Sequence, residues 1–280
     1  MRVPEDGAQR ASSNRSVRLT VLGLAFALVG AFAVANPTPA AAAGMKVVIV
    51  VGPVGSSTAN YRDNARRYAS QARSYGASVV EIYSPNATWS RVKAAAQGAN
   101  VLIYLGHGNG SPSPYGAFSR YTKDGMGLNK TAGNGNSNTK YWGEWYMSTY
   151  LKLAPNAVVI LNRLCYASGN SEWGTANPTR ATAIKRVDNY GAGFLRTGAK
   201  AVFADGITSA SYVLYGLFRT NRSMGAIFQS SPDFNGGYDF RFSSSRTPGT
   251  TAWMAPYKPN RYYRSVIGNL GLTAANVRSH

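Results

Sequence analysis

Apolar residues along this chain gather in short continuous runs, and the segments between the runs repeat their apolar positions with helical spacing. The runs at 45–51, 101–105 and 157–161 are almost wholly apolar, as strands covered on both faces require, and shorter runs lie at 79–83 and 201–204. Helical spacing is found at 60–75, 89–97, 144–153 and 190–197. Strands that alternate with helices predict an α/β fold, here a three-layer α/β/α sandwich with a mostly parallel sheet.

Two polar segments interrupt this alternation. Residues 106–143 are rich in Gly, Ser, Asn and Pro, and residues 166–179 form a second polar excursion, so we expect surface loops beside a binding cleft. Residues 209–229 are expected to be helical. Aromatic and β-branched stretches in 239–266, broken by prolines, predict a peripheral hairpin. The predicted organisation is therefore a main domain at 45–229 and a small β-rich C-terminal extension at 230–280 packed on it.

The first 43 residues are typical of a secretory signal peptide and a linker. Three arginines, Arg10, Arg15 and Arg18, precede an uncharged apolar run of 15 residues at 21–35. A bilayer-spanning helix needs about 20 apolar residues, and Ala33-Val34-Ala35 offers the small residues that a signal peptidase requires. A cleavage site within 40–43 and an uncleaved anchor are the alternatives. We expect an exported protein, secreted or held in the cell envelope, with no transmembrane segment after cleavage.

The charge is strongly one-sided. The 280 residues include 30 Lys and Arg but 11 Asp and Glu, a net charge of +19, and removal of the leader leaves +17. Such a charge attracts anionic partners, among which a cell-envelope polymer is expected. No specific nucleic-acid partner is expected, because the basic residues are scattered and the standard recognition motifs are absent.

Reactive side chains are few. One cysteine excludes an intramolecular disulfide, and with two histidines it excludes a zinc site built from Cys and His alone, so no metal or cofactor is expected. The chain also lacks a phosphate-binding loop with its lysine and a Gly-x-Ser-x-Gly elbow. A glycosidase built on two carboxylates stays open, since the distance between acids is not visible in a sequence.

The one cysteine and one of the two histidines follow buried strands. His107 lies two residues beyond the run at 101–105, and Cys165 lies four beyond the run at 157–161. Active sites of open α/β sheets lie at the carboxyl ends of the strands, so adjacent strands would bring thiol and imidazole together for acyl transfer. Backbone N–H groups of Gly108 and Cys165 would then form an oxyanion hole. The alternatives are a small buried hydrophobe for Cys165 and an ordinary loop residue for His107.

One apolar strand runs into His107-Gly108, and a second runs into Cys165, which lies 58 residues after the histidine. This pair of motifs, in this order, resembles the caspase, legumain and gingipain group of cysteine peptidases. The segment 191–204 is similar to the helix and strand after the catalytic cysteine of gingipain-like bacterial members, and the resemblance spans 45–210. It implies a caspase-like fold with His107 as general acid and base, Cys165 as nucleophile and the Gly108 N–H as an oxyanion donor.

Residues Asn60-Tyr61-Arg62 are similar to a legumain-type segment. That similarity implies that Asn60 orients the catalytic histidine and that Arg62 lines the primary specificity pocket, where it would receive Asn or Asp. Asp63 and Asp205 are alternative substrate-binding residues for Lys or Arg. An ordinary helix start and surface or capping charges are the competing interpretations of these four residues.

Two functional hypotheses follow. The first is an exported cysteine endopeptidase that hydrolyses protein or peptide substrates by a Cys165/His107 dyad through a thioacyl intermediate. The second is a catalytically inactive caspase-like module that binds anionic cell-envelope polymers or proteins. The first predicts that cleavage is lost with Cys165, and the second predicts salt-sensitive attachment that survives that loss.

Overall fold

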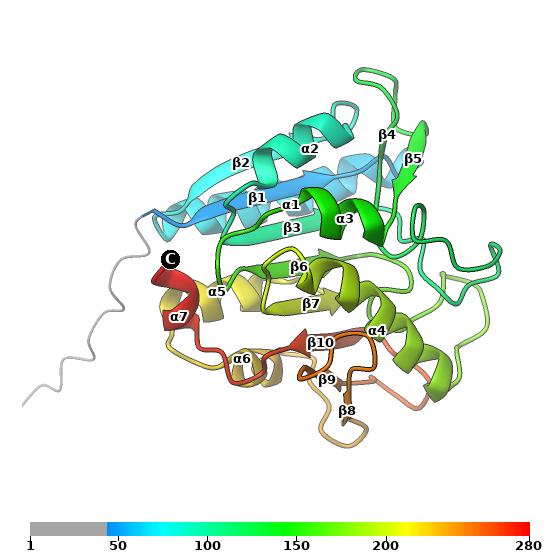
Figure 1. Ribbon diagram of the computed structural model, residues 1–280, viewed down its shortest axis with the longest axis vertical. Helices are drawn as coiled ribbons and strands as arrows, with labels where there is room; N and C mark the ends of the chain where they lie inside the picture. The colour runs from blue at the N-terminus through cyan, green and yellow to red at the C-terminus, as the bar shows by residue number, and fades with distance from the viewer. Residues whose placement is uncertain (1–43) are drawn as a thin grey trace, which may run out of the picture. The chain divides into compact units, whose positions relative to one another are not determined.

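A single eight-stranded sheet forms the centre of the protein, as the computed structural model of residues 44–280 shows (Figure 1). The strand order is β2-β1-β3-β6-β7-β10-β9-β8. The first five of these strands are parallel, and the last three are antiparallel to their neighbours. Their bounds are β1 Lys46–Val51, β2 Ser78–Tyr83, β3 Val101–Leu105, β6 Val158–Asn162, β7 Ala201–Asp205, β8 Phe240–Ser243, β9 Thr251–Met254 and β10 Arg264–Gly268. The predicted leader lies outside the described residues.

Helices cover both faces of the sheet (Figure 1). One face packs against α1 (Thr58–Ser74), α5 (Ser211–Arg219), α6 (Met224–Gln229) and α7 (Ala274–Arg278), and a short 3₁₀ turn, η1 (Gly55–Ser57), precedes α1. The other face packs against α2 (Trp89–Ala96), α3 (Glu144–Tyr150) and α4 (Arg180–Leu195). Strands β3, β6 and β7 are buried at every position, because apolar side chains point alternately into the two helical layers. The predicted three-layer α/β/α fold is confirmed.

Helix α4 is twice as long as the sequence pattern predicted. It begins at Arg180, where the Thr179 side chain accepts a hydrogen bond from the Thr182 N–H, rather than at residue 190. The helix carries Arg186 and Asp188 near its middle, and both are buried but polar, so no continuous apolar stripe marks this part of it. The Asp188 carboxylate accepts hydrogen bonds from Ser244 and Ser245, partners that only the folded chain brings near.

The long polar segment 106–143 contains a hairpin that the sequence pattern did not reveal. Strands β4 (Met126–Asn129) and β5 (Thr139–Trp142) form a separate two-stranded sheet. The Tyr104 hydroxyl of β3 accepts from the Gly127 N–H at 2.9 Å, which ties this hairpin to the end of the main sheet. The rest of the segment is loop, as expected.

The C-terminal region is more closely integrated than a peripheral hairpin. Strand β10 pairs with β7, and β9 and β8 follow it outward, so these strands continue the main sheet. The region 209–229 is helical as expected, but it divides into α5 and α6. The residues 44–280 contain no helix long and apolar enough to cross a membrane.

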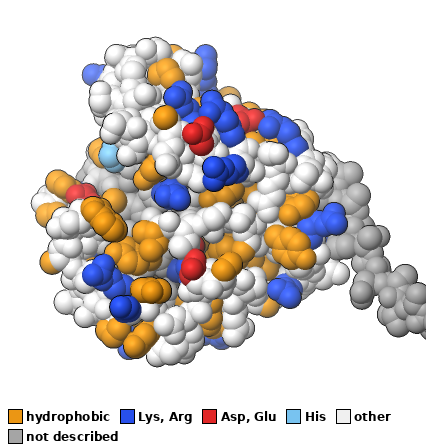
Figure 2. All heavy atoms as spheres, turned by 180° about the vertical axis from the view of Figure 1, so that it is seen from behind, with side chains coloured by type: hydrophobic (Ala, Val, Ile, Leu, Met, Phe, Trp, Pro, Cys, Tyr) orange, Lys and Arg blue, Asp and Glu red, His pale blue; other side chains and the backbone are white. Residues whose placement is uncertain are grey.

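Basic side chains do not form one continuous stripe on the face of the molecule that Figure 2 shows. On the face opposite to that of Figure 1, Lys and Arg are scattered among uncharged residues, and acidic side chains are few (Figure 2). Scattered positive charge is suited to long-range attraction of anions rather than to reading a groove of nucleic acid.

Candidate active site

Hydrogen bonds anchor the loop that carries Cys165 to the end of β7 and the residues after it, and to helix α1. The Asn162 amide, at the end of β6, donates to the carbonyl oxygens of Asp205 (3.1 Å) and Thr208 (2.9 Å). The Tyr61 hydroxyl of α1 donates to the Arg163 carbonyl at 3.1 Å. Arg163 and Tyr166, on either side of the cysteine, have φ values of 60° and 70°, a region that non-glycine residues rarely occupy. The tertiary contacts thus hold a strained turn that presents the thiol at the edge of the sheet.

The loop that carries His107 is held in a similar way. The Tyr104 hydroxyl lies 3.0 Å from the His107 carbonyl oxygen, and the Asn109 N–H donates to the Tyr190 hydroxyl of α4 at 2.9 Å. The Lys123 ammonium is buried and donates to the Asn109 side-chain oxygen, the Ser113 hydroxyl and the Tyr115 carbonyl at 2.8–3.0 Å. These bonds fix the path of the chain after β3.

Gly108 and Cys165 bring the two loops into direct backbone contact. A Cβ atom built on Gly108 would lie 1.9 Å from the Cys165 carbonyl oxygen and 3.0 Å from its nitrogen. Only a residue without a side chain allows this approach. Within residues 44–280, neither the Gly108 N–H nor the Cys165 N–H donates to a protein acceptor. Two free N–H groups beside a thiol are what an oxyanion hole requires.

His107, Gly108 and Cys165 line one open pocket of about 600 Å³. The charged side chains in its wall are those of Lys123 and Glu172. Both Glu172 oxygens accept from phenols, Tyr166 at 2.9 Å and Tyr115 at 2.7 Å. The remaining lining residues are Asn109, Tyr115, Ala117, Thr122 and Tyr141, which confirms that both polar segments lie beside a cleft.

Thiol and imidazole are both uncharged near neutral pH. Burial and the Glu172 carboxylate raise the pKa of Cys165 to about 11, against a smaller opposing effect of Arg186. The His107 side chain is exposed to solvent, yet the surrounding protein removes part of its hydration and lowers its pKa. No hydrogen bond joins the two side chains within the part of the chain that the structure describes. Thiol and imidazole therefore share the pocket as neutral groups.

Replacing Glu172 with glutamine is expected to accelerate alkylation of Cys165 by iodoacetamide a few-fold at pH 8. The substitution removes a negative charge that raises the pKa of Cys165, so the thiolate fraction at that pH increases. The measurement is the rate of labelling followed by mass spectrometry. Glu81→Gln removes an acid on β2 and serves as the control. A labelling rate equal to or below that of the native protein would contradict the conclusion that the Glu172 charge raises the pKa of Cys165.

The structure does not bring Asn60, Arg62 or Asp63 into this pocket. Asn60 is exposed, and its side-chain oxygen accepts from the Asn64 amide one turn along α1 at 2.8 Å. Arg62 donates to the Ser84 carbonyl at 3.4 Å, and the Asp63 carboxylate pairs with Arg66 at 2.8 Å. None of the three lines the pocket. Their roles in orienting His107 or in binding substrate stay predictions without a supporting contact.

Asp205 lies near the cysteine loop but is occupied by structural bonds. One carboxylate oxygen accepts from the Thr208 N–H and hydroxyl at 2.9 and 2.6 Å. The other lies 3.3 Å from Nε of Arg264, its register partner on β10, and both side chains are buried. The predicted binding of a substrate cation by Asp205 therefore has no free oxygen to support it, and the geometry favours a structural role.

Arg264→Leu is expected to destabilise the protein by about 3–5 kcal/mol, because it leaves the Asp205 carboxylate buried without its cation. Arg66→Leu breaks the exposed pair with Asp63 and is expected to cost less than about 1 kcal/mol. Urea unfolding of both variants measures the difference. Equal losses in the two variants would show that the buried pair is not a stability determinant.

Glu172 is the residue of this pocket that sequence reasoning missed. It is the only acid between Glu144 and Asp188, and it lies in a segment expected to border the cleft. The isolation of Glu172 among uncharged residues was a signal from which the sequence could have identified it as a candidate site residue. The described residues contain no group of three or more His, Cys, Asp or Glu side chains that could hold a metal ion.

Comparison with known proteins gives distant structural similarities only. No protein family matches the sequence, and no curated protein does. The chain is similar to a short-chain flavodoxin associated with a PDU bacterial microcompartment, with 10% identity, a TM-score of 0.27, and coverage of 56% of this chain and 77% of that one.

It is also similar to a secreted C11 cysteine protease from Bacteroides thetaiotaomicron, solved with an irreversible peptide inhibitor. Identity is 10%, the TM-score is 0.35, and the match covers 76% of this chain and 66% of the protease. Because both TM-scores are low, we derive no function from either similarity.

Proposed function

We propose that this protein is a cysteine endopeptidase in which Cys165 is the nucleophile and His107 the general base and acid. The observation that carries the proposal is the contact between the loops after β3 and β6. The two loops approach so closely at Gly108 that no side chain fits, and both reactive side chains line the same open pocket.

The neutral resting state suits a concerted attack. As Sγ of Cys165 bonds to the substrate carbonyl carbon, His107 takes the thiol proton, and the carbonyl oxygen becomes an oxyanion. The Gly108 and Cys165 N–H groups would donate to that oxygen. When the C–N bond breaks, His107 returns the proton to the leaving amine, which leaves a thioester. Water then attacks the thioester with His107 again as base, and the acid product and free thiol are released.

The proposed substrates are proteins or peptides outside the cell or in its envelope. The pocket is open, which admits a chain that continues on both sides of the cleaved bond. The leader pattern supports export. The net charge of +17 expected after cleavage would draw the enzyme toward anionic surfaces.

The test is cleavage of a mixed peptide pool by purified protein, with products identified by mass spectrometry. We expect the native protein to cleave the pool and Cys165→Ala to leave it intact, with iodoacetamide labelling confined to Cys165. A Cys165→Ala variant that cleaves as well as the native protein would refute the proposed nucleophile.

A binding module is the second candidate, and the high pKa of the Cys165 thiol favours it. In that case the native protein cleaves nothing, and it attaches to an anionic polymer in a way that salt weakens and that Cys165→Ala leaves unchanged. Retention on a polyanionic resin at rising NaCl, compared between the two proteins, separates the candidates.

A further inference from the structure

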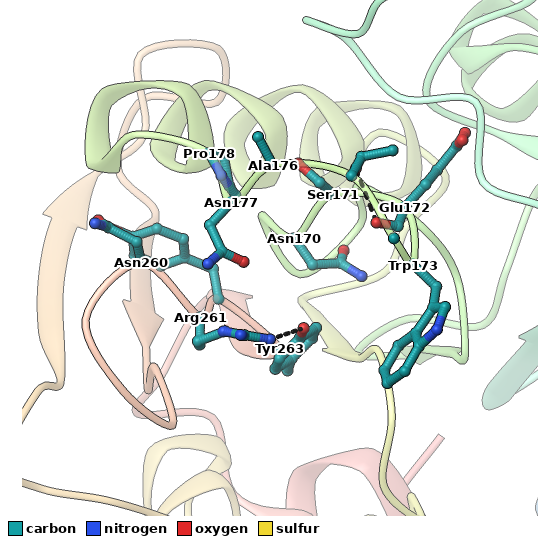
Figure 3. A pocket seen from close by; sticks show the side chains of 13 residues that line it. Asn170, Ser171, Glu172, Trp173, Ala176, Asn177, Pro178, Asn260, Arg261 and Tyr263 are labelled. Atoms are coloured by element: carbon teal, nitrogen blue, oxygen red, sulfur yellow. Dashed lines mark hydrogen bonds between the residues drawn. The ribbon is translucent and has the colours of Figure 1, made fainter.

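A second pocket, of about 390 Å³, shares a lining residue with the one that contains Cys165. Figure 3 shows the side chains of this second pocket. Glu172 lines both pockets, so the two lie on either side of, or next to, that residue. The second pocket lies between the loop after Cys165 and the loop that joins β9 to β10. Its walls are formed by residues 170–178 and 260–263.

Arg261 is the cation of this pocket, and its charge is uncompensated. Within residues 44–280 the guanidinium forms no ion pair, and its one side-chain hydrogen bond runs from Nη1 to the Tyr263 hydroxyl at 3.3 Å (Figure 3). The side chain is exposed, so water can leave it for a ligand. A guanidinium presents five donors in a planar fork that matches a carboxylate.

Two further side chains are free to bind beside Arg261. The Asn177 side-chain amide forms no hydrogen bond within the described residues and points toward Arg261 (Figure 3). Trp173 is 90% exposed, a high fraction for an indole. The one acid of the lining, Glu172, has both oxygens engaged by phenols and lies at the junction with the first pocket.

We propose that this second pocket binds an acidic side chain of the peptide substrate, with Arg261 as the residue that recognises the carboxylate. The inference rests on the proposed peptidase function, because it takes the bound peptide to be a substrate. The binding itself does not require cleavage. An extended peptide lying across Cys165 would reach the pocket past Glu172. Trp173 would pack over the backbone of the bound peptide. The overall positive charge of the protein would draw acidic segments to the cleft.

The test uses an array of immobilised octapeptides in matched pairs that differ by Glu against Gln at one position. The non-cleaving Cys165→Ala protein is applied, and retention is measured. We expect a subset of the Glu peptides to be retained about fivefold more than the matched Gln peptides, as a solvent-accessible ion pair allows. Adding Arg261→Ala should bring that ratio to one, and Arg261→Lys should restore part of it.

Adding Arg222→Ala is the matched control, because it removes an equal charge from an exposed arginine outside the pocket. We expect it to keep the Glu preference. Equal retention of the matched peptides, or a Glu preference that survives Arg261→Ala, would overturn the inference. Failure of the peptidase proposal would instead appear as absent cleavage by the native protein, whatever the array shows.

Discussion

Gly108→Ala is expected to lower kcat/KM for peptide cleavage by at least about 100-fold. The new Cβ would lie 1.9 Å from the Cys165 carbonyl oxygen and within 3.0 Å of its nitrogen and carbonyl carbon. These are backbone atoms, so no rotation of a side chain relieves the clash, and the His107 and Cys165 loops must separate. Separation would displace the proposed base from the proposed nucleophile and the two proposed oxyanion donors from each other. We also expect a stability loss of about 1–3 kcal/mol from overpacking.

Steady-state kinetics and urea unfolding of Gly108→Ala measure both effects. Gly236→Ala is the control, since a Cβ there meets its nearest atom at 3.6 Å, an ordinary contact. We expect that control to match the native protein. If Gly108→Ala retained native kcat/KM, the contact between the loops would not be part of the catalytic geometry.

His107→Gln is expected to lower kcat/KM by about 10²–10⁴-fold, the usual contribution of a general base. The pKa of His107 lies below its usual value, so the imidazole is neutral at pH 7 and can accept the thiol proton. Native activity should therefore fall as the pH drops through that pKa, because protonation removes the base. In the variant this limb should disappear, and the residual rate should rise with pH toward the titration of Cys165 at about 11.

The pH dependence of kcat/KM for both proteins is the measurement. His280→Gln replaces the other histidine, at the end of the chain, and should behave as the native protein. A His107→Gln variant with an unchanged pH profile would exclude His107 as the base.

The strands were the most predictable elements. Runs such as 101–105 and 157–161 are apolar at every position or nearly so, and the structure places β3 and β6 there within one residue. Two of the elements that the pattern missed, in whole or in part, contain buried polar groups. The first half of α4 contains buried Arg186, and β4 is a short strand containing a glycine inside a polar segment. Their stability comes from partners far along the chain, which periodicity does not record.

For the candidate site, sequence order and the rule of strand ends were enough to predict that His107, Gly108 and Cys165 lie in one place, and the structure has all three in the lining of one pocket. The same reasoning gave Asp205 a substrate role that its bonds to Thr208 and Arg264 do not support. It also overlooked Glu172 and Arg261. The isolation of Glu172 among uncharged residues was a signal, whereas a loop arginine such as Arg261 has no distinguishing pattern until the residues around it in space are known.

The amino-acid sequence by itself determined the alternation of strands and helices and the placement of the thiol and imidazole at the same edge of the sheet. Those features depend on local periodicity and on the direction of parallel strands. The tertiary structure alone decided which charges are compensated and which are free to bind. Compensation depends on contacts between residues such as Asp205 and Arg264, 59 positions apart, that only the folded chain creates.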